Sequence, residues 1–371
     1  MNRIYNSLIK SIGALALTGL AACDYIHDDS LEPCEYRLRL VYDYNMKFAD
    51  AFGHEVTKAA LFICDNKGNF IRRQDIEGAE LKANDIAMDL KPGTYQVLTW
   101  AGLDDSSYQW PELTPGSSTI EEIRVKTLRE ADATQPNELT PLWHALDTLV
   151  VTGDRHEEKE ISLAKNTNKL RVVLQDTEGY SMDVRDFSFR IVADNGYMDY
   201  DNALLDDPAI TYLPYHTESV DIAAGADDDD LINGKPANQY VAVAELNTMR
   251  LMAGENYRLI VRHKDWEDDV LNVNLNQYLL LTQMEGHNIS AQEYLDRQDE
   301  YSIVFFLTPI VCPDCPDPEP DPEPEPEPEP DPKPDPDPDP EIPEPDVPIV
   351  GYACYKIQVK DWIIRINSGE L

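Results

Sequence analysis

Short apolar or alternating runs separated by turn residues dominate residues 36–311 of the chain. Each run is typical of a half-buried or fully buried β-strand, and turns such as Asn66–Asn69, Pro92-Gly93 and Asp194–Gly196 separate several of them. Short strands at regular spacing favour a β-sandwich architecture. The predicted strands are 36–44, 58–65, 70–76, 95–100, 161–163, 170–174, 186–194, 239–246, 256–263, 269–276 and 300–309.

Helical periodicity is rare in this pattern, and we expect helices only at residues 120–128 and 291–298. The polar break Asn166-Thr167-Asn168 separates two series of strands, so we place a domain boundary near residue 166. The sequence thus predicts an all-β protein with two tandem β-sandwich domains, at residues 34–165 and 166–311.

Residues 312–350 have a different composition, with proline at nearly every second position and acids between. Proline fixes φ and removes amide donors, so this segment is expected to be an extended polyproline II spacer or a looped-out insertion that adds nothing to a core. Residues 351–371 return to β-like alternation. A strand at 355–366 is therefore predicted, with these candidate packing residues: Tyr355, Ile357, Val359, Trp362, Ile363, Ile364 and Ile366.

The N-terminus carries Arg3 and Lys10, followed by an apolar run at residues 11–22. This run is shorter than the roughly 20 residues of a membrane span but suits the apolar region of a secretory signal peptide. Leu20-Ala21-Ala22-Cys23 resembles the bacterial lipobox. The resemblance implies cleavage between Ala22 and Cys23, a leader at 1–22, lipidation of Cys23 and a tether at 23–33; the alternative is an ordinary leader with a chance cysteine.

Lipidation would tether the protein to a membrane without inserting it. Each buried methylene contributes ~0.8 kcal/mol, so two or three acyl chains hold a protein durably where one does not. The acids Asp24, Asp28 and Asp29 resemble the export signal that sends some lipoproteins to the outer face of the outer membrane. We therefore expect a lipid-anchored, surface-exposed protein of the outer membrane.

The formal net charge of −39 excludes nucleic acid as a partner and disfavours direct binding to anionic headgroups. Residues 313–348 hold 15 acids and one lysine, but the rest of the chain is also strongly acidic. The run Asp227–Asp230 could bind calcium, but it lacks the spaced ligands and glycine of a calcium loop, which favours a solvated loop.

Besides Cys23 the chain has five cysteines, and export to an oxidising compartment permits disulfides. Cys34 and Cys64 would lie at the same end of two strands if 36–44 and 58–65 were antiparallel neighbours. Cys354 could pair with Cys312 or Cys315 and close the base of the proline segment, which would contribute ~4 kcal/mol. The Cys312–Cys315 spacing also occurs in redox and zinc sites, but proline prevents the helix and no second ligand pair follows, so a structural role is favoured.

No catalytic constellation is recognisable in the sequence. The seven histidines form no metal or nucleophile motif, and no nucleophile elbow, P-loop or dinucleotide fingerprint occurs. His144 in LWHAL is interpreted as a packed or hydrogen-bonded residue. We expect no enzyme activity, no metal site and no cofactor.

Several stretches together are similar to the lipidated anchor (minor) subunits of type V fimbriae, the fimbrillin-associated anchor proteins. They are residues 40–56, 90–104, 142–151, 163–174, 194–205 and 292–307, in an order and spacing that match from Cys23 to Leu307. The resemblance implies two transthyretin-like β-sandwich domains, an outer-membrane lipid anchor, and a role at the base of a fimbrium, where the protein holds the shaft and limits its length. The proline-rich segment departs from the family pattern.

The resemblance also implies a mode of contact with the shaft subunit. Type V shafts grow by strand donation, in which a segment of one subunit completes an open sheet of another; main-chain hydrogen bonds supply affinity. Residues 355–366 are then either a donated strand carried on the proline rod or a strand that closes the second domain of the same chain.

Two other functions remain open at this point. A surface glycan-binding lipoprotein would present aromatic side chains on one face, for which Tyr197, Tyr200, Tyr212 and Tyr215 are candidates. A fimbrial tip adhesin of related architecture is the second alternative.

Overall fold

The computed structural model describes residues 35–222, 239–281, 283, 288–312 and 348–359, and the backbone of 362–365. The expected all-β class is confirmed, with the strands in five sheets. The strands are β1 (Tyr36–Val41), β2 (Lys58–Asp65), β3 (Phe70–Glu77), β4 (Ile86–Met88), β5 (Gly93–Ala101), β6 (Tyr108–Gln109), β7 (Val125–Thr127), β8 (Thr134–Gln135), β9 (Trp143–Val151), β10 (Glu157–Ser162), β11 (Ala164–Lys165), β12 (Thr167–Asp176), β13 (Phe187–Ala193), β14 (Tyr197–Met198), β15 (Ile210–Tyr212), β16 (His216–Asp221), β17 (Tyr240–Met249), β18 (Arg258–His263), β19 (Asp269–Asn274), β20 (Glu300–Val311), β21 (Ile349–Val359) and β22 (Trp362–Arg365). The short helices are α2 (Phe52–Glu55), α3 (Gly78–Ala83), α4 (Leu275–Leu280) and α5 (Ala291–Arg297), with 3₁₀ turns η1 (Ile120–Glu122) and η2 (Val184–Asp186).

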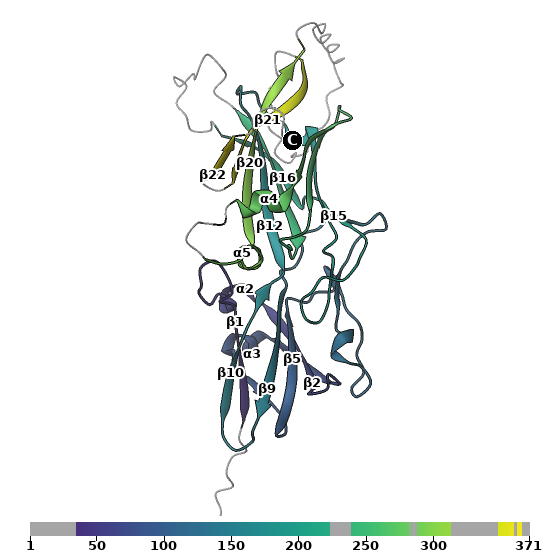
Figure 1. Ribbon diagram of the computed structural model, residues 1–371, viewed down its shortest axis with the longest axis vertical. Helices are drawn as coiled ribbons and strands as arrows, with labels where there is room; N and C mark the ends of the chain where they lie inside the picture. Colours follow the sequence, from purple (N-terminus) through teal and green to yellow (C-terminus); the bar gives the residue numbers. More distant parts are fainter. Residues whose placement is uncertain are drawn as a thin grey trace, which may run out of the picture.

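Two sheets enclose the core of the N-terminal half, one ordered β10-β1-β4 and the other β11-β9-β5-β2-β3 (Figure 1). β1 lies in the centre of its sheet, parallel to β10 and antiparallel to β4. Leu38 and Leu40 of β1 are fully buried between the sheets. The apolar pattern of residues 36–41 therefore produces an internal strand rather than an edge.

Strand β2 is buried on both faces, which explains its continuous apolar run. Leu61 and Ile63 face the core between the two sheets, whereas Phe62 and Cys64 point to the opposite side. The segment between β5 and β9 covers that opposite side. Two of its strands join sheets of the C-terminal half, since β7 pairs with β14 and β8 pairs with β15.

The C-terminal half contains a six-stranded sheet, β16-β17-β12-β20-β21-β22, and a five-stranded sheet, β19-β18-β13-β15-β8. Leu170, Val172 and Leu174 alternate along β12 and are buried in a core that continues to the outer face of β2 and β5. The two halves stack along the long axis of the molecule (Figure 1).

The expected helix at residues 120–128 is wrong. The structure has the 3₁₀ turn η1, with a capping box between Thr119 and Glu122, followed by β7. Burial of Ile120, Ile123 and Val125 fits a turn that enters a strand as well as it fits one face of a helix. The apolar spacing therefore does not distinguish the two structures. Helix α5 agrees with the other expectation, and the strand predicted at 269–276 ends at Asn274, whose side chain caps α4.

The chain after the proline-rich segment returns to its own C-terminal half. β21 pairs antiparallel with β20 and begins at Ile349, before the predicted start, and β22 pairs with β21. The Cys312 N–H donates to the Pro348 carbonyl at 3.2 Å, so the chain leaves and re-enters the domain at adjacent points. This pairing corresponds to the closing-strand alternative.

The expected disulfides of Cys64 and Cys354 are wrong. Both side chains are free, buried thiols, and burial raises the pKa of each to about 12. The reasoning for Cys34 with Cys64 failed because β1 and β2 lie in different sheets. Cys354 lies on β21 and packs in the hydrophobic core, so the expected disulfide from Cys354 to Cys312 or Cys315 is wrong. Cys312 is disulfide-bonded, with a partner outside the described residues.

Candidate functional site

Contacts between the two halves form the first candidate site, because these contacts hold the two halves against each other. Lys165 lies there with 11% of its side chain exposed, and its Nζ contacts Glu55 at 2.8 Å and Asp299 at 2.5 Å. Burial alone would lower the pKa of Lys165, but the two carboxylates outweigh it and the pKa is raised. The amine also lies 5.3 Å from the centre of the Trp143 ring.

A second group of junction contacts surrounds α5. The Arg297 guanidinium lies 4.0 Å from the centre of the Tyr44 ring and 4.5 Å from that of Phe48, and the Arg297 carbonyl accepts from the Met46 N–H. These loop residues follow β1, whereas α5 precedes β20. These contacts therefore join the loop that follows β1 to α5 of the C-terminal half.

His144 belongs to the same junction, as a packed and hydrogen-bonded residue, in agreement with the sequence interpretation. It is 6% exposed, its Nε2 donates to the Tyr200 carbonyl at 2.8 Å, and its ring packs edge-on against Trp100. Burial lowers the pKa of His144 to about 4, so the imidazole is neutral at pH 7. A neutral, enclosed imidazole that packs on Trp100 and donates to a backbone carbonyl fits the packed, hydrogen-bonded role predicted for His144.

The C-terminal strands form the second candidate site. Ile357 and Val359 are fully buried and Cys354 is 7% exposed, whereas Tyr355 is 54% exposed. Trp362 and Ile364 lie in β22, at one edge of the six-stranded sheet. An edge strand presents unpaired backbone groups to another chain.

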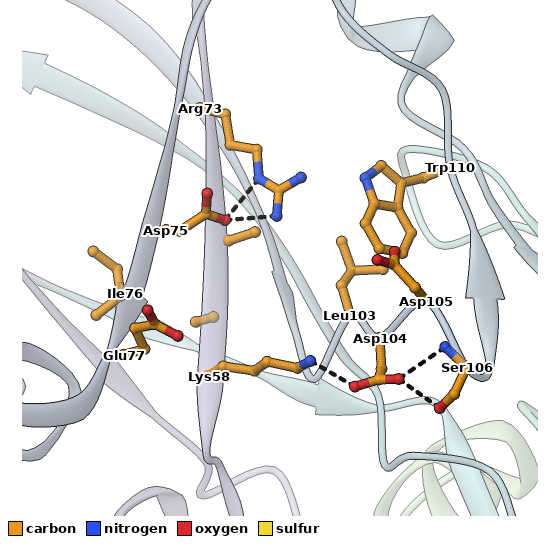
Figure 2. A pocket seen from close by; sticks show the side chains of 12 residues that line it. Lys58, Arg73, Asp75, Ile76, Glu77, Leu103, Asp104, Asp105, Ser106 and Trp110 are labelled. Atoms are coloured by element: carbon orange, nitrogen blue, oxygen red, sulfur yellow. Dashed lines mark hydrogen bonds and ion pairs between the residues drawn. The ribbon is translucent and has the colours of Figure 1, made fainter.

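A hollow of about 620 Å³ on the outer face of β2 and β3 is the third candidate, and it was not among the sites predicted from the sequence (Figure 2). One wall comes from β2 and β3, and the other from residues 103–110. Lys58 contacts Asp104 at 2.7 Å and Arg73 contacts Asp75 at 2.6 Å. Hydrogen bonds from Lys58 and Ser106 hold the pKa of Asp104 well below its usual range.

Other predicted residues are placed apart or lie outside the described ranges. Tyr212 is 1% exposed and donates to Asn195 at 2.9 Å, and the Tyr215 hydroxyl donates to Glu245 at 3.3 Å. The four tyrosines therefore do not form one exposed face. Outside the described residues lie Ala22, Cys23, Cys34, Cys315 and the run Asp227–Asp230.

Neither a metal-ligand cluster nor a membrane-spanning helix occurs within the described ranges. No three His, Cys, Asp or Glu side chains within them gather as a metal site would require. Among the helices of the same ranges, none is long and apolar enough to cross a bilayer.

The all-β architecture, the strand-paired halves and the sheet edge at β22 define the class of the chain: an all-β protein whose sheet edge can pair with another chain. The family model of the fimbrillin-A-associated anchor proteins Mfa1 and Mfa2 matches residues 31–368. The chain belongs to this family, which confirms the resemblance seen in the sequence. A fimbria-associated role at the cell surface follows from this membership.

Solved structures agree with this membership. A putative polysaccharide-binding protein from Bacteroides thetaiotaomicron is 30% identical, with a TM-score of 0.69 over 90% of this chain and 99% of the other. A putative adhesin from the same organism is 28% identical, with a TM-score of 0.69 over 91% and 100% of the two chains. The fimbrial anchor protein Mfa2 from Porphyromonas gingivalis shares the fold, with 16% identity and a TM-score of 0.61 over 90% and 99%. No curated protein matches the sequence.

Proposed function

We propose that this chain is the lipid-attached basal subunit of a type V fimbrium, which holds the shaft and limits its length. The position of β1 carries the proposal. β1 is the first strand after the tether, and it fills the centre of its sheet with Leu38 and Leu40 fully buried. Growth by strand donation needs a subunit with an open sheet. A subunit whose sheet is already filled can bind a shaft on one side only and ends the fibre.

The shaft-binding surface in this proposal is the sheet edge at β22. Releasing β21 for donation would expose Ile357 and Val359 at a cost of about 1.5–3 kcal/mol for each side chain. A strand of the shaft subunit added beside β22 gains main-chain hydrogen bonds without that cost. We therefore propose strand addition at this edge rather than release of β21.

An engineered disulfide between β20 and β21 distinguishes addition of a shaft strand beside β22 from release of β21. Phe306 and Lys356 lie directly opposite each other in the β20–β21 pairing, so the pair Phe306→Cys and Lys356→Cys would link β20 to β21. The stapled protein should recover the shaft subunit from co-expressing cells as well with oxidant as with reductant. Recovery that disappears on oxidation and returns on reduction would show that β21 must leave.

Deletion of β22 tests the edge itself. A chain that ends at Lys360 should keep its melting temperature and lose shaft recovery at least tenfold. The matched control replaces residues 361–371 by a Gly-Ser segment of equal length and should behave like the deletion. Equal shaft recovery from the full chain and the deletion would refute the proposed surface, and no recovery from the full chain would refute the anchor function.

Membrane attachment through Cys23 is the remaining part of the proposal. The wild-type protein should fractionate with outer membranes and carry a diacylglycerol-modified N-terminal cysteine by mass spectrometry, and Cys23→Ser should abolish both. Immunogold labelling at the cell surface supports the anchor, whereas labelling at the distal fibre end would favour the tip-adhesin alternative.

A further inference from the structure

The hollow beside β3 has the shape of a small-molecule site, and nothing in the fimbrial role accounts for it. Its floor is Ala60 of β2, which faces the same side of the strand as the much larger Phe62, whereas the Ala59 side chain faces the core between the two N-terminal sheets. A methyl side chain next to a phenyl ring on the same face leaves a depression in the sheet surface. Trp110, from the segment after β6, forms a wall of this depression and is only partly buried (Figure 2).

Fixed polar groups surround the depression. The Arg73 guanidinium donates to Asp75 through Nε at 2.7 Å and lies 5.7 Å from the centre of the Trp110 ring and 5.4 Å from that of Phe62. On the other side Lys58 is held by Asp104, which also accepts from the Ser106 N–H and hydroxyl. Both cations are therefore paired with a carboxylate at the hollow, and Lys58, whose partner Asp104 is itself held by Ser106, is the better positioned of the two.

Two carboxylates at the hollow have no such partners. Asp105 and Glu77 make no hydrogen bond or ion pair within the described part of the chain, and both are exposed (Figure 2). They are free acceptors beside the paired groups. A ligand with several hydrogen-bond donors would satisfy them, and hydrogen bonds to a carboxylate are roughly twice as strong as neutral ones.

The charge at the hollow selects among ligands. Its lining holds four carboxylates and two cations, and the whole chain carries a formal charge of −39. This field repels anionic sugars such as uronates and sulfated glycans. A neutral hexose offers hydroxyl donors to Asp105 and Glu77 and hydroxyl acceptors to Lys58 and Arg73. Its C–H face can also pack on the negative face of the Trp110 ring.

We propose that this hollow is a carbohydrate-binding site for neutral hexose units of a glycan. Trp110 supplies the stacking surface, Asp105 and Glu77 accept hydroxyl protons, and the Lys58–Asp104 and Arg73–Asp75 pairs set the orientation of the ring. The volume of about 620 Å³ accommodates one or two sugar rings. The site lies in the N-terminal half, away from the C-terminal edge, so it does not depend on the proposed shaft contact.

The test is a binding array with the full chain and three probe classes: neutral hexose oligosaccharides (glucose, mannose and galactose series), glucosamine oligosaccharides with free amines, and oligogalacturonates. Neutral probes should bind, oligogalacturonates should not, and the neutral hit should be titrated calorimetrically. Trp110→Ala should weaken that binding at least tenfold. Trp266→Ala, a partly buried tryptophan outside the hollow, is the matched control and should bind within twofold of wild type.

A second variant pair excludes a folding artefact. Asp105→Asn and Glu77→Gln change exposed side chains without removing bulk, and the double variant should lose at least tenfold in affinity at an unchanged melting temperature. Absence of neutral-glycan binding at millimolar concentration would overturn the proposal. So would binding restricted to amine probes or to a lysine-rich peptide, which would point to a cationic partner, and so would a neutral-glycan affinity that these variants leave unchanged.

Discussion

Mild acid should weaken the junction between the two halves through His144. This imidazole is 6% exposed and its pKa is lowered to about 4, against 6.5 in the unfolded chain. The folded protein therefore keeps His144 neutral, while the unfolded chain binds a proton as the pH falls below 6.5. The contribution of neutral His144 to the free energy of unfolding is complete above pH 6.5 and is lost progressively as the pH falls toward 4.

The size of the effect follows from the two pKa values. At pH 5 the unfolded state gains about 2 kcal/mol from protonating this one residue, and the limit below pH 4 is about 3.4 kcal/mol. A carboxylate whose pKa is lowered by folding contributes only about 0.1 kcal/mol between pH 7 and pH 5, because its unfolded pKa of about 4 lies below this window. The sum over many carboxylates cancels when the wild type is compared with a variant at His144. Burial also lowers the pKa of His263, so that residue adds an effect of the same sign.

Urea denaturation at pH 7 and pH 5, followed by circular dichroism, measures the loss. In His144→Gln the amide can still donate to the Tyr200 carbonyl but does not titrate, so the loss between the two pH values should shrink by about 2 kcal/mol. His54→Gln removes an exposed imidazole and serves as the control. If wild type and His144→Gln lose the same free energy within about 0.5 kcal/mol, the burial argument is refuted.

Three further changes test, by denaturation, the junction between the halves, the internal position of β1 and the role of the proline-rich segment. Lys165→Met should cost about 2 kcal/mol, less than a fully buried pair because Asp299 is 22% exposed; an unchanged midpoint would show that this contact does not hold the halves together. Leu40→Ala should cost about 3 kcal/mol by leaving a cavity beside β1, and a loss below about 1 kcal/mol would mean that β1 is not an internal strand. Replacing residues 316–347 by about eight Gly-Ser residues should stabilise the protein by only about 1 kcal/mol, because closure entropy varies slowly with loop length; a large destabilisation would mean that the segment packs on the domain.

Local patterns were the reliable part of the sequence, as β2 illustrates. Its apolar run is bounded by Lys58 and by the Asn66–Asn69 turn, and the strand has the predicted limits. The 120–128 prediction failed because its apolar spacing fits a turn that enters a strand as well as it fits a helix face. Short-range signals define where an element begins better than how far it continues.

Pairings between distant segments could not be read from the sequence. The parallel pairing of β1 with β10 and of β8 with β15 depends on the whole fold, and the wrong disulfide for Cys64 came from assuming that successive strands are neighbours. The hollow was missed for the same reason, because Lys58, Arg73 and Trp110 come from three separate segments. Its available signal was the solvent-accessible Trp110 soon after the acids Asp104 and Asp105.

The direction of β1 determines how the base of such a fibre would fail. With the membrane attachment proposed at Cys23, tension enters β1 at Tyr36 and leaves through strands at the opposite end of the molecule (Figure 1). The pull runs along β1, whose residues from Tyr36 to Val41 all pair with β10. A pull along the strand loads all of its hydrogen bonds to β10 at the same time. A pull perpendicular to the strand would instead break these hydrogen bonds one after another. Under the proposed anchor function, the first strand would have to slide out as a unit before the fibre detaches.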